Sequence, residues 1–190
     1  MINKKELYFY RTKGYLTPNW KFSYNQLDDL KNNLEKLISD NKNIRPEQLV
    51  CPHIKGGSMG ILKGNTHKYF IKLAYNEEII QLITPIIGKN ILLWGSQVFC
   101  KPPKDGMAVP MHQDSYYWPI KPMSTCSVWI AIDKSSKING CLKVIPKSHK
   151  EYFKHEKSHE DTALDSGIPL KILKDKKIDY IILKPGQLSL

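Results

Sequence analysis

The sequence predicts an α+β fold, because helical patterns occupy the first part of the chain and short strand-like runs follow them. Turn residues such as Gly, Pro and Asn separate those runs, which is typical of a β-sandwich or barrel. A chain of 190 residues with 41% hydrophobic residues can bury one core but is too short for two typical domains. We therefore expect a single domain over residues 1–190.

The first expected element is an amphipathic helix from Ser23 to about Asp40. Ser23 and Gln26 have the spacing of a capping box, in which each side chain satisfies a backbone amide at the helix start. Apolar residues then repeat at helical spacing, namely Leu27, Leu30, Leu34, Leu37 and Ile38. Residues 41–59 are rich in polar residues, proline and glycine, and we expect a loop there.

A second helix is expected from Asn76 towards Gly88. Asn76 is a good N-cap, and Glu77 and Glu78 complement the positive end of the helix. Pro85 should bend this helix or end it.

Strands are expected from residue 91 onwards, at 91–100, 126–133, 142–145 and 178–183. These runs are rich in branched and aromatic residues. Asn139-Gly140 and Pro185-Gly186 are turn signals, because Gly and Asn tolerate positive φ and Pro favours turns.

Composition limits the classes of function. The net charge of +11 favours an anionic partner, but the lysines are dispersed and no aromatic-basic module accompanies them, so we interpret them as a solvated surface. We expect no nucleic-acid or membrane partner. The chain has no apolar run that could act as a secretory signal or span a bilayer, which predicts a soluble, cytoplasmic protein. The cysteines lack Cys-x-x-Cys spacing and are expected to be reduced core residues; they are Cys51, Cys100, Cys126 and Cys141.

His112-Gln113-Asp114 is the most informative motif for chemistry. Alternate residues of an extended segment point to one side, which places the imidazole and the carboxylate side by side. Two such groups are part of the 2-His-1-carboxylate face that leaves open positions on Fe(II). An isolated His-x-Asp also arises by chance as a capped turn or a surface hydrogen bond, so the surrounding sequence has to decide.

The surrounding blocks resemble the phytanoyl-CoA dioxygenase family in order and spacing. Residues 94–103 read Trp-Gly-Ser-Gln-Val-Phe-Cys-Lys-Pro-Pro, and 109–114 read Val-Pro-Met-His-Gln-Asp. They are followed by Tyr-Tyr-Trp-Pro at 116–119, Val-Trp-Ile-Ala-Ile-Asp at 128–133 and Asn-Gly-Cys-Leu-Lys-Val-Ile-Pro-Lys-Ser-His at 139–149. The resemblance extends over about residues 91–190 and, more loosely, over 9–88.

This resemblance implies a double-stranded β-helix that uses Fe(II), 2-oxoglutarate and O2 to hydroxylate a C–H bond. It implies His112 and Asp114 as catalytic iron ligands, and Gln97, Lys101 and Trp129 as contacts of 2-oxoglutarate. Judged without the resemblance, Trp129 would be core, Gln97 a buried amide, and Lys101 an exposed loop residue. The carboxylate of Asp114 also argues against the halogenating relatives, which need a non-coordinating residue at that position.

Several neighbouring residues have more than one interpretation. The aromatic run Tyr116, Tyr117 and Trp118 could wall a pocket or simply pack in the core. His149 lies in the family's Pro-x-Ser-His turn, which is not a ligand position. We expect none of His149, His155 and His159 to complete the metal site.

The resemblance also implies a third iron ligand, a histidine after a Pro-Gly-x turn, and then an arginine that binds 2-oxoglutarate. Pro185-Gly186 is the matching turn, and no residue from there to Leu190 fills either position. We therefore expect a piece of a longer protein that lacks the closing strands, in preference to a catalytically inactive remnant or binding domain. A zinc hydrolase that uses His112 and Asp114 is a further alternative, which would not need oxygen. The substrate is expected to be a small molecule or an acyl-CoA, and the oligomeric state stays open.

Overall fold

The computed structural model describes residues 1–158 and 161–190, which form two compact units. The helical unit contains Met1 and Lys21–Gly106, and the strand-bearing unit contains Ile2–Trp20 and Met107–Leu190. The prediction of one domain over residues 1–190 stays a prediction.

The longest helix of the helical unit is α2 (Tyr24–Asp40), which begins where the sequence predicted. Ser23 is its N-cap, and the capping box with Gln26 is present. Leu30 and Leu37 are buried at 2% and 1% exposure, so the predicted apolar stripe is the packed side of the helix.

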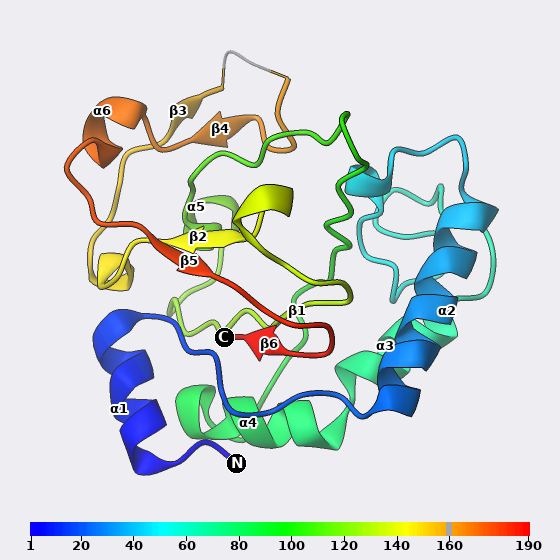
Figure 1. The fold of residues 1–190 in the computed structure, drawn as a ribbon, viewed down its shortest axis with the longest axis horizontal. Helices are drawn as coiled ribbons and strands as arrows, with labels where there is room; N and C mark the ends of the chain where they lie inside the picture. Colours follow the sequence, from blue (N-terminus) through cyan, green and yellow to red (C-terminus); the bar gives the residue numbers. More distant parts are fainter. Residues whose placement is uncertain (159–160) are drawn as a thin grey trace. The chain divides into compact units, whose positions relative to one another are not determined.

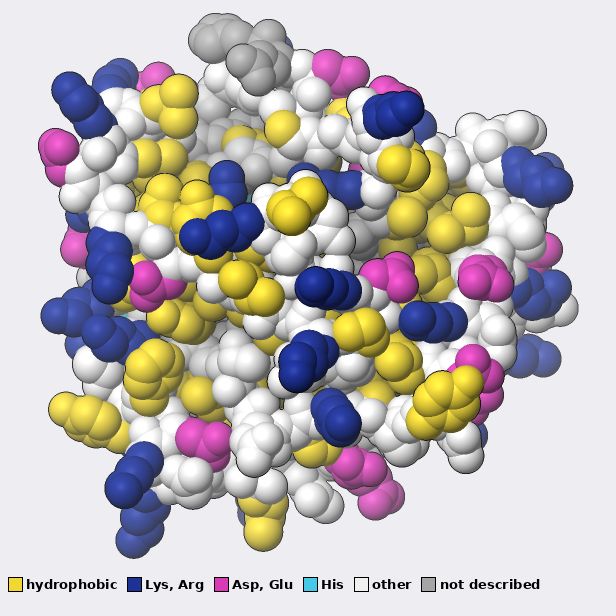
Figure 2. All heavy atoms as spheres, viewed as in Figure 1, with side chains coloured by type: hydrophobic (Ala, Val, Ile, Leu, Met, Phe, Trp, Pro, Cys, Tyr) yellow, Lys and Arg dark blue, Asp and Glu magenta, His cyan; other side chains and the backbone are white. Residues whose placement is uncertain are grey.

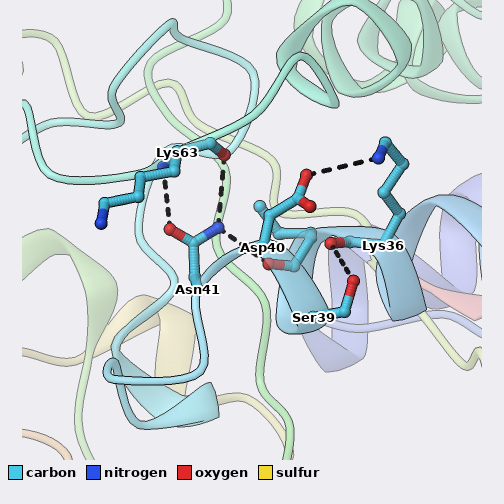
Figure 3. A network of polar contacts seen from close by, with 6 residues as sticks. Lys36, Ser39, Asp40, Asn41 and Lys63 are labelled. Carbon is cyan, nitrogen blue, oxygen red and sulfur yellow. Dashed lines mark hydrogen bonds and ion pairs between the residues drawn. The ribbon is translucent and has the colours of Figure 1, made fainter.

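Residues 41–66 form a largely irregular segment with one 3-10 turn, η1 (Pro46–Gln48), in agreement with the predicted loop. The buried side chain of Asn41 organises its start (Figure 3). Its amide nitrogen donates to the carbonyls of Leu37 and Lys63, and its amide oxygen accepts from the Lys63 backbone N–H at 2.8 Å. Lys36 and Asp40 form an ion pair on the last turns of α2. One amide side chain thus ends the helix and fixes the loop that returns to it.

Two further helices complete the helical unit. Helix α3 (His67–Ala74) was not among the helices expected from the sequence. The predicted second helix is α4 (Glu77–Ile87), with Asn76 accepting a hydrogen bond from the Ile79 N–H. Pro85 does not end α4, because the helix continues to Ile87 and ends at Gly88, which has φ of 89°.

The strand-bearing unit begins with α1 (Lys4–Lys13), a second helix that was not expected from the sequence. Asn3 caps it, with Glu6 completing a capping box, and Gly14 ends it in the left-handed conformation at φ of 87°. The imidazole of His149 donates to the Arg11 carbonyl and lies where a side chain at position 14 would be. Glycine is therefore required at position 14 for this packing as well as for its φ.

The described strands are short and pair as antiparallel ladders of two (Figure 1). The pairs are β1 (Trp129–Ile130) with β6 (Leu188–Ser189), β2 (Leu142–Val144) with β5 (Asp179–Ile181), and β3 (Glu156–Lys157) with β4 (Ser166–Gly167). The remaining elements of this unit are α5 (Asp114–Tyr117), α6 (Leu170–Leu173), η2 (Lys137–Asn139) and η3 (Ser148–Lys150).

Three of the expected strands contain these ladders, and one does not. Residues 126–133 contain β1, residues 142–145 contain β2, and residues 178–183 contain β5. Residues 91–100 form no ladder, and Gln97 makes only an isolated antiparallel bridge to Val50. The mixture of helices and strands confirms the predicted α+β composition.

Two apolar clusters hold the strand-bearing unit together. One consists of Ala131, Ile181 and Leu183, with Trp129, Tyr15, Leu142 and Val144 packed against it. The other consists of Ile145, Phe153, Ile168 and Leu173, with Met111 packed against it. Met111 directly precedes His112, so the second cluster anchors the segment that carries the candidate metal ligands.

On the face that Figure 2 shows, lysine and arginine side chains are spread among apolar and acidic ones. They do not gather into one basic patch in that view. All four cysteines are free, and only Cys141 is buried. Among the described residues, no helix combines the length and the apolar character that crossing a membrane requires.

Candidate metal centre

The segment before His112 is placed by contacts with the 162–168 region. Ala163 donates its backbone N–H to the Ala108 carbonyl at 2.9 Å, and Ile168 donates to Met111 at 2.7 Å. A Cβ on Gly167 would come within 2.7 Å of Pro110, so only glycine allows this close approach. Long-range backbone contacts therefore determine where His112 lies.

His112 and Asp114 point toward each other, as the sequence predicted. Nε2 of His112 lies 3.2 Å from Oδ1 of Asp114. The backbone at Gln113 is extended, with φ of −113° and ψ of 126°, and Asp114 begins the short helix α5. The alternation therefore applies up to Asp114, and a helical turn follows it.

Each of the two candidate ligands is fixed by a second hydrogen bond. Nδ1 of His112 lies 2.8 Å from the Pro110 carbonyl, and since a carbonyl only accepts, Nδ1 carries the proton. Nε2, on the other side of the ring, faces Asp114. The other carboxylate oxygen of Asp114 accepts a 2.7 Å hydrogen bond from Ser127 Oγ.

The pair shifts the pKa of both groups. Burial acts most strongly on His112 and disfavours its charged form, but hydrogen bonds to Asp114 and Pro110 and the Asp114 charge together raise its pKa. Burial likewise acts most strongly on Asp114, yet hydrogen bonds from His112 and Ser127 lower its pKa. Asp114 is therefore ionised at neutral pH, and a metal ion that bound both groups would displace the proton between them.

This arrangement fits two ligands of an iron(II) site. Ligand atoms on neighbouring positions of a metal, with bonds of about 2.1 Å at right angles, lie roughly 3.0 Å apart, close to the 3.2 Å between Nε2 and Oδ1. Metal-bound histidines usually donate their other N–H to a carbonyl or carboxylate, as His112 does to Pro110. Within the described residues, no third His, Cys, Asp or Glu joins the pair.

Of the aromatic residues after Asp114, Tyr117 contacts the pair directly and Tyr116 contacts a neighbouring histidine. The Tyr117 ring meets the His112 ring edge-on at 5.8 Å, and its hydroxyl donates to the Ser166 carbonyl. The Tyr116 ring stacks on the buried His155 at 4.2 Å. Of the other histidines considered, His149 contacts α1, and His159 lies outside the described residues.

The three residues predicted to contact 2-oxoglutarate belong to different units. Trp129 lies in the strand-bearing unit, half-buried against the Ala131 cluster. Gln97 and Lys101 lie in the helical unit. The Gln97 amide nitrogen donates to the Glu47 carbonyl at 3.5 Å, and both Gln97 and Lys101 are exposed residues. Their part in cosubstrate binding stays a prediction.

Sequence reasoning missed Ser127, Gln113 and the buried His155 as neighbours of the ligand pair. A signal existed for Ser127, because it lies two residues before Trp129 and alternation places both on one side of an extended segment. His155 carried no such signal, because its place depends on how residues 148–155 return to residue 113.

The chain resembles known proteins along most of its length. The family model for phytanoyl-CoA dioxygenase (PhyH) matches residues 10–181. A Dictyostelium discoideum homolog of phytanoyl-CoA dioxygenase domain-containing protein 1 is 29% identical over 151 residues, which are 77% of this chain and 52% of that protein. The human peroxisomal phytanoyl-CoA dioxygenase is 35% identical over 82 residues, or 40% of this chain and 24% of the relative.

Two further matches widen the comparison. A probable alpha-ketoglutarate-dependent hypophosphite dioxygenase of Stutzerimonas stutzeri is 35% identical over 45% of this chain and 31% of its own length. The solved apo structure of the non-heme monooxygenase ThoJ shares the fold with a TM-score of 0.67, at 16% identity, over 96% of this chain and 66% of that one. The chain thus spans between a quarter and about half of the length of these curated relatives.

Proposed function

Because the chain belongs to the phytanoyl-CoA dioxygenase family, we propose that it is part of an iron(II)- and 2-oxoglutarate-dependent dioxygenase that hydroxylates a C–H bond. The observation that carries the proposal is the convergence of His112 Nε2 and Asp114 Oδ1 at 3.2 Å, with Nδ1 already engaged by Pro110. Since the chain covers only part of its relatives' length, the activity is proposed for the whole protein.

His112 and Asp114 would hold the iron. When bound, iron(II) with 2-oxoglutarate supplies the oxidising power to insert one oxygen atom of O2 into the substrate, with release of succinate and carbon dioxide. The chain's own residues orient the ligands through Pro110 and Ser127. The carboxylate of Asp114 favours hydroxylation over halogenation, since it occupies the position that a halide would need.

The cosubstrate contacts are proposed to be Gln97, Lys101 and Trp129. Lys101 supplies an exposed cation suited to a carboxylate. The side-chain amide of Gln97 and the indole of Trp129 can each donate a hydrogen bond. The short antiparallel pairs of the strand-bearing unit are proposed to form part of a double-stranded β-helix, in keeping with the ThoJ likeness.

The substrate is proposed to be anionic, either an acyl-CoA or a small metabolite. Relatives named phytanoyl-CoA dioxygenase support the first class, and the hypophosphite dioxygenase supports the second. The net charge of +11 attracts either class at long range. We place this reaction in the cytoplasm, with no nucleic-acid or membrane partner.

The metal site is tested with the purified chain and its His112→Ala variant, by titration with Co(II) and by Fe(II)-dependent formation of succinate from 2-oxoglutarate. Removal of a direct ligand should weaken Co(II) binding by more than the roughly 10- to 100-fold that loss of an outer-sphere partner causes. Asp114→Asn should weaken it in the same direction, because a neutral amide replaces an anionic ligand.

His149→Ala is the matched control, because this histidine lies in the same unit and contacts the Arg11 carbonyl. It should bind Co(II) as the wild type does. If His112→Ala binds Co(II) as tightly as the wild type, the proposed site is wrong. If Co(II) binds through His112 but the whole protein forms no succinate with iron, 2-oxoglutarate and substrate, the non-catalytic binding domain is the better description.

A further inference from the structure

We propose that His155 is a positioning residue for the iron site, acting through the peptide that joins the two ligands. The inference rests on the proposed function and extends it to a histidine outside the metal-binding motif. His155 is 42 residues away in sequence from Gln113, and it is buried at 6% exposure.

Both ring nitrogens of His155 are occupied by backbone groups. Nε2 accepts a 2.9 Å hydrogen bond from the Gln113 backbone N–H, between His112 and Asp114. Nδ1 lies 2.9 Å from the Phe153 carbonyl, which can only accept, so Nδ1 donates. These partners select the tautomer with its proton on Nδ1. The imidazole thereby links the ligand segment to residue 153 through one rigid ring.

The Gln113 side chain strengthens the same link. Its amide nitrogen donates to the carbonyls of Ser148 and Glu151, and its amide oxygen accepts from the Phe153 N–H at 2.9 Å. The backbone N–H of Gln113 bonds to His155, so both the side chain and the backbone of Gln113 are attached to the segment 148–155. Gln113, the residue between the two candidate ligands, is therefore held in place by the segment 148–155.

A ring contact holds the other side of Asp114. Tyr116 belongs to α5, the helical turn that Asp114 begins, and its ring stacks on His155 at 4.2 Å with an interplanar angle of 9°. His155 therefore contacts the chain one residue before Asp114 and two residues after it. A shift of the imidazole would move the backbone on both sides of that carboxylate.

This geometry explains why a residue without metal contact should matter for metal binding. The peptide at Gln113 sets the angle between the two ligand side chains, and a metal ion tolerates little error in that angle. Partners that orient metal ligands typically contribute roughly 10- to 100-fold to metal affinity. We expect the contribution of His155 to lie in this range.

The test compares two amide substitutions that each keep one of the two hydrogen bonds. His155→Gln places an amide oxygen near the former Nε2 and can still accept from Gln113. His155→Asn is shorter, reaches only the position of Nδ1 and can keep the Phe153 contact alone. The readouts are Co(II) affinity and hydrogen exchange of the Gln113 amide in the metal-free chain, with circular dichroism to confirm folding.

His155→Asn should bind Co(II) roughly 10- to 100-fold more weakly than the wild type, and its Gln113 amide should exchange at least about 10-fold faster. His155→Gln should stay within about 3-fold of the wild type on both measures. His149→Asn, which changes a histidine that contacts α1, should alter neither measure.

Equal Co(II) affinities for the Asn and Gln variants, beside a wild type that binds through His112, would overturn this inference alone. Faster amide exchange in His155→Asn without weaker Co(II) binding would also overturn it, because the link would then not orient the ligands. A wild type that binds Co(II) no better than His112→Ala would remove the proposed function and this inference with it.

Discussion

The helices of the helical unit carry their own start signals, whereas the strands of the other unit depend on distant residues. Ser23 and Asn76 cap α2 and α4 within the first turn of each helix. By contrast, no described strand exceeds three residues, and β2 exists only by pairing with β5, whose partner residues lie 35 to 39 positions further along the chain. Local chemistry is sufficient to start the helices but not to form the strands.

The candidate site belongs to the second kind of structure. His112, Gln113, Asp114, Ser127 and His155 all lie in the strand-bearing unit. The hydrogen bonds from Ser127 to Asp114 and from Gln113 to His155 span 13 and 42 residues. Changes to the core of that unit should therefore affect its stability strongly, whereas a lost cap should have a limited and local effect.

The largest effect is expected from Leu183→Ala. Leu183 is 1% exposed within the Ala131 cluster. Its backbone N–H donates to the Ser135 carbonyl, and its carbonyl accepts from the Ser135 N–H. Truncation leaves a cavity that should cost about 2 to 5 kcal/mol of the free energy of unfolding. Urea unfolding followed by circular dichroism measures this loss.

Ile182→Ala is the matched control, because Ile182 is the preceding residue and is 57% exposed. Its truncation should change the free energy of unfolding by less than about 0.5 kcal/mol. Similar losses for both variants would contradict the contrast between the packed and the solvent-facing side of this segment.

A smaller and more local effect is expected from Asn76→Ala. The Asn76 side chain accepts the Ile79 N–H at 3.0 Å, and loss of an N-cap of this kind typically costs about 1 kcal/mol. Asn76→Ser keeps a capping oxygen and should recover most of that loss. Hydrogen exchange should show faster opening of α4 in the alanine variant, with the β2–β5 amides unchanged.

The comparison would fail if Asn76→Ala loosened β2–β5 as much as α4. Such a result would mean that the cap supports the whole chain and not only its own helix.

An effect confined to alkaline pH is a loss of stability to which one tyrosine in each unit contributes. Burial, then the hydrogen bond and charge of Asp179, raise the pKa of Tyr15 from 10.0 to about 12. Burial, then the Asp29 charge, raise the pKa of Tyr69 to about 12. The folded chain keeps these protons where the unfolded chain loses them, so this stability is present below about pH 10 and declines as the pH rises through about 12.

Urea unfolding at about pH 9 and about pH 11 measures this decline. Tyr15→Phe and Tyr69→Phe should each make the free energy of unfolding less dependent on pH in that interval, because phenylalanine has no proton to lose. If both variants keep the wild-type dependence, other groups cause the alkaline loss.

Much of the helical structure was predictable, and the exceptions have physical reasons. The capping box at Ser23 and the cap at Asn76 placed α2 and α4 correctly. The helix α1 has an equally good capping box at Asn3 and Glu6. Its sequence is too polar to show an apolar stripe, and none of its residues is buried. The helix α3, which was not expected, follows Thr66, whose side chain makes no cap hydrogen bond.

The strands were predicted by composition but not by extent. Residues 126–133 read as one strand, yet only Trp129 and Ile130 form a ladder, opposite Ser189 and Leu188. Residues 91–100 have equally strong β character and form only the Gln97 bridge. Branched residues favour extended backbone, but a ladder forms only where a partner lies alongside.

The sequence by itself determined the helix starts, the α+β composition and the side-by-side placement of His112 and Asp114, because each depends on residues a few positions apart. Only the tertiary structure decided that Ser127 would hold the carboxylate, that Gly167 would admit Pro110, and that His155 would hold the amide between the two ligands. Those contacts join residues 13 to 57 positions apart. Their formation depends on the packing of the whole strand-bearing unit, which no local pattern in the chain encodes.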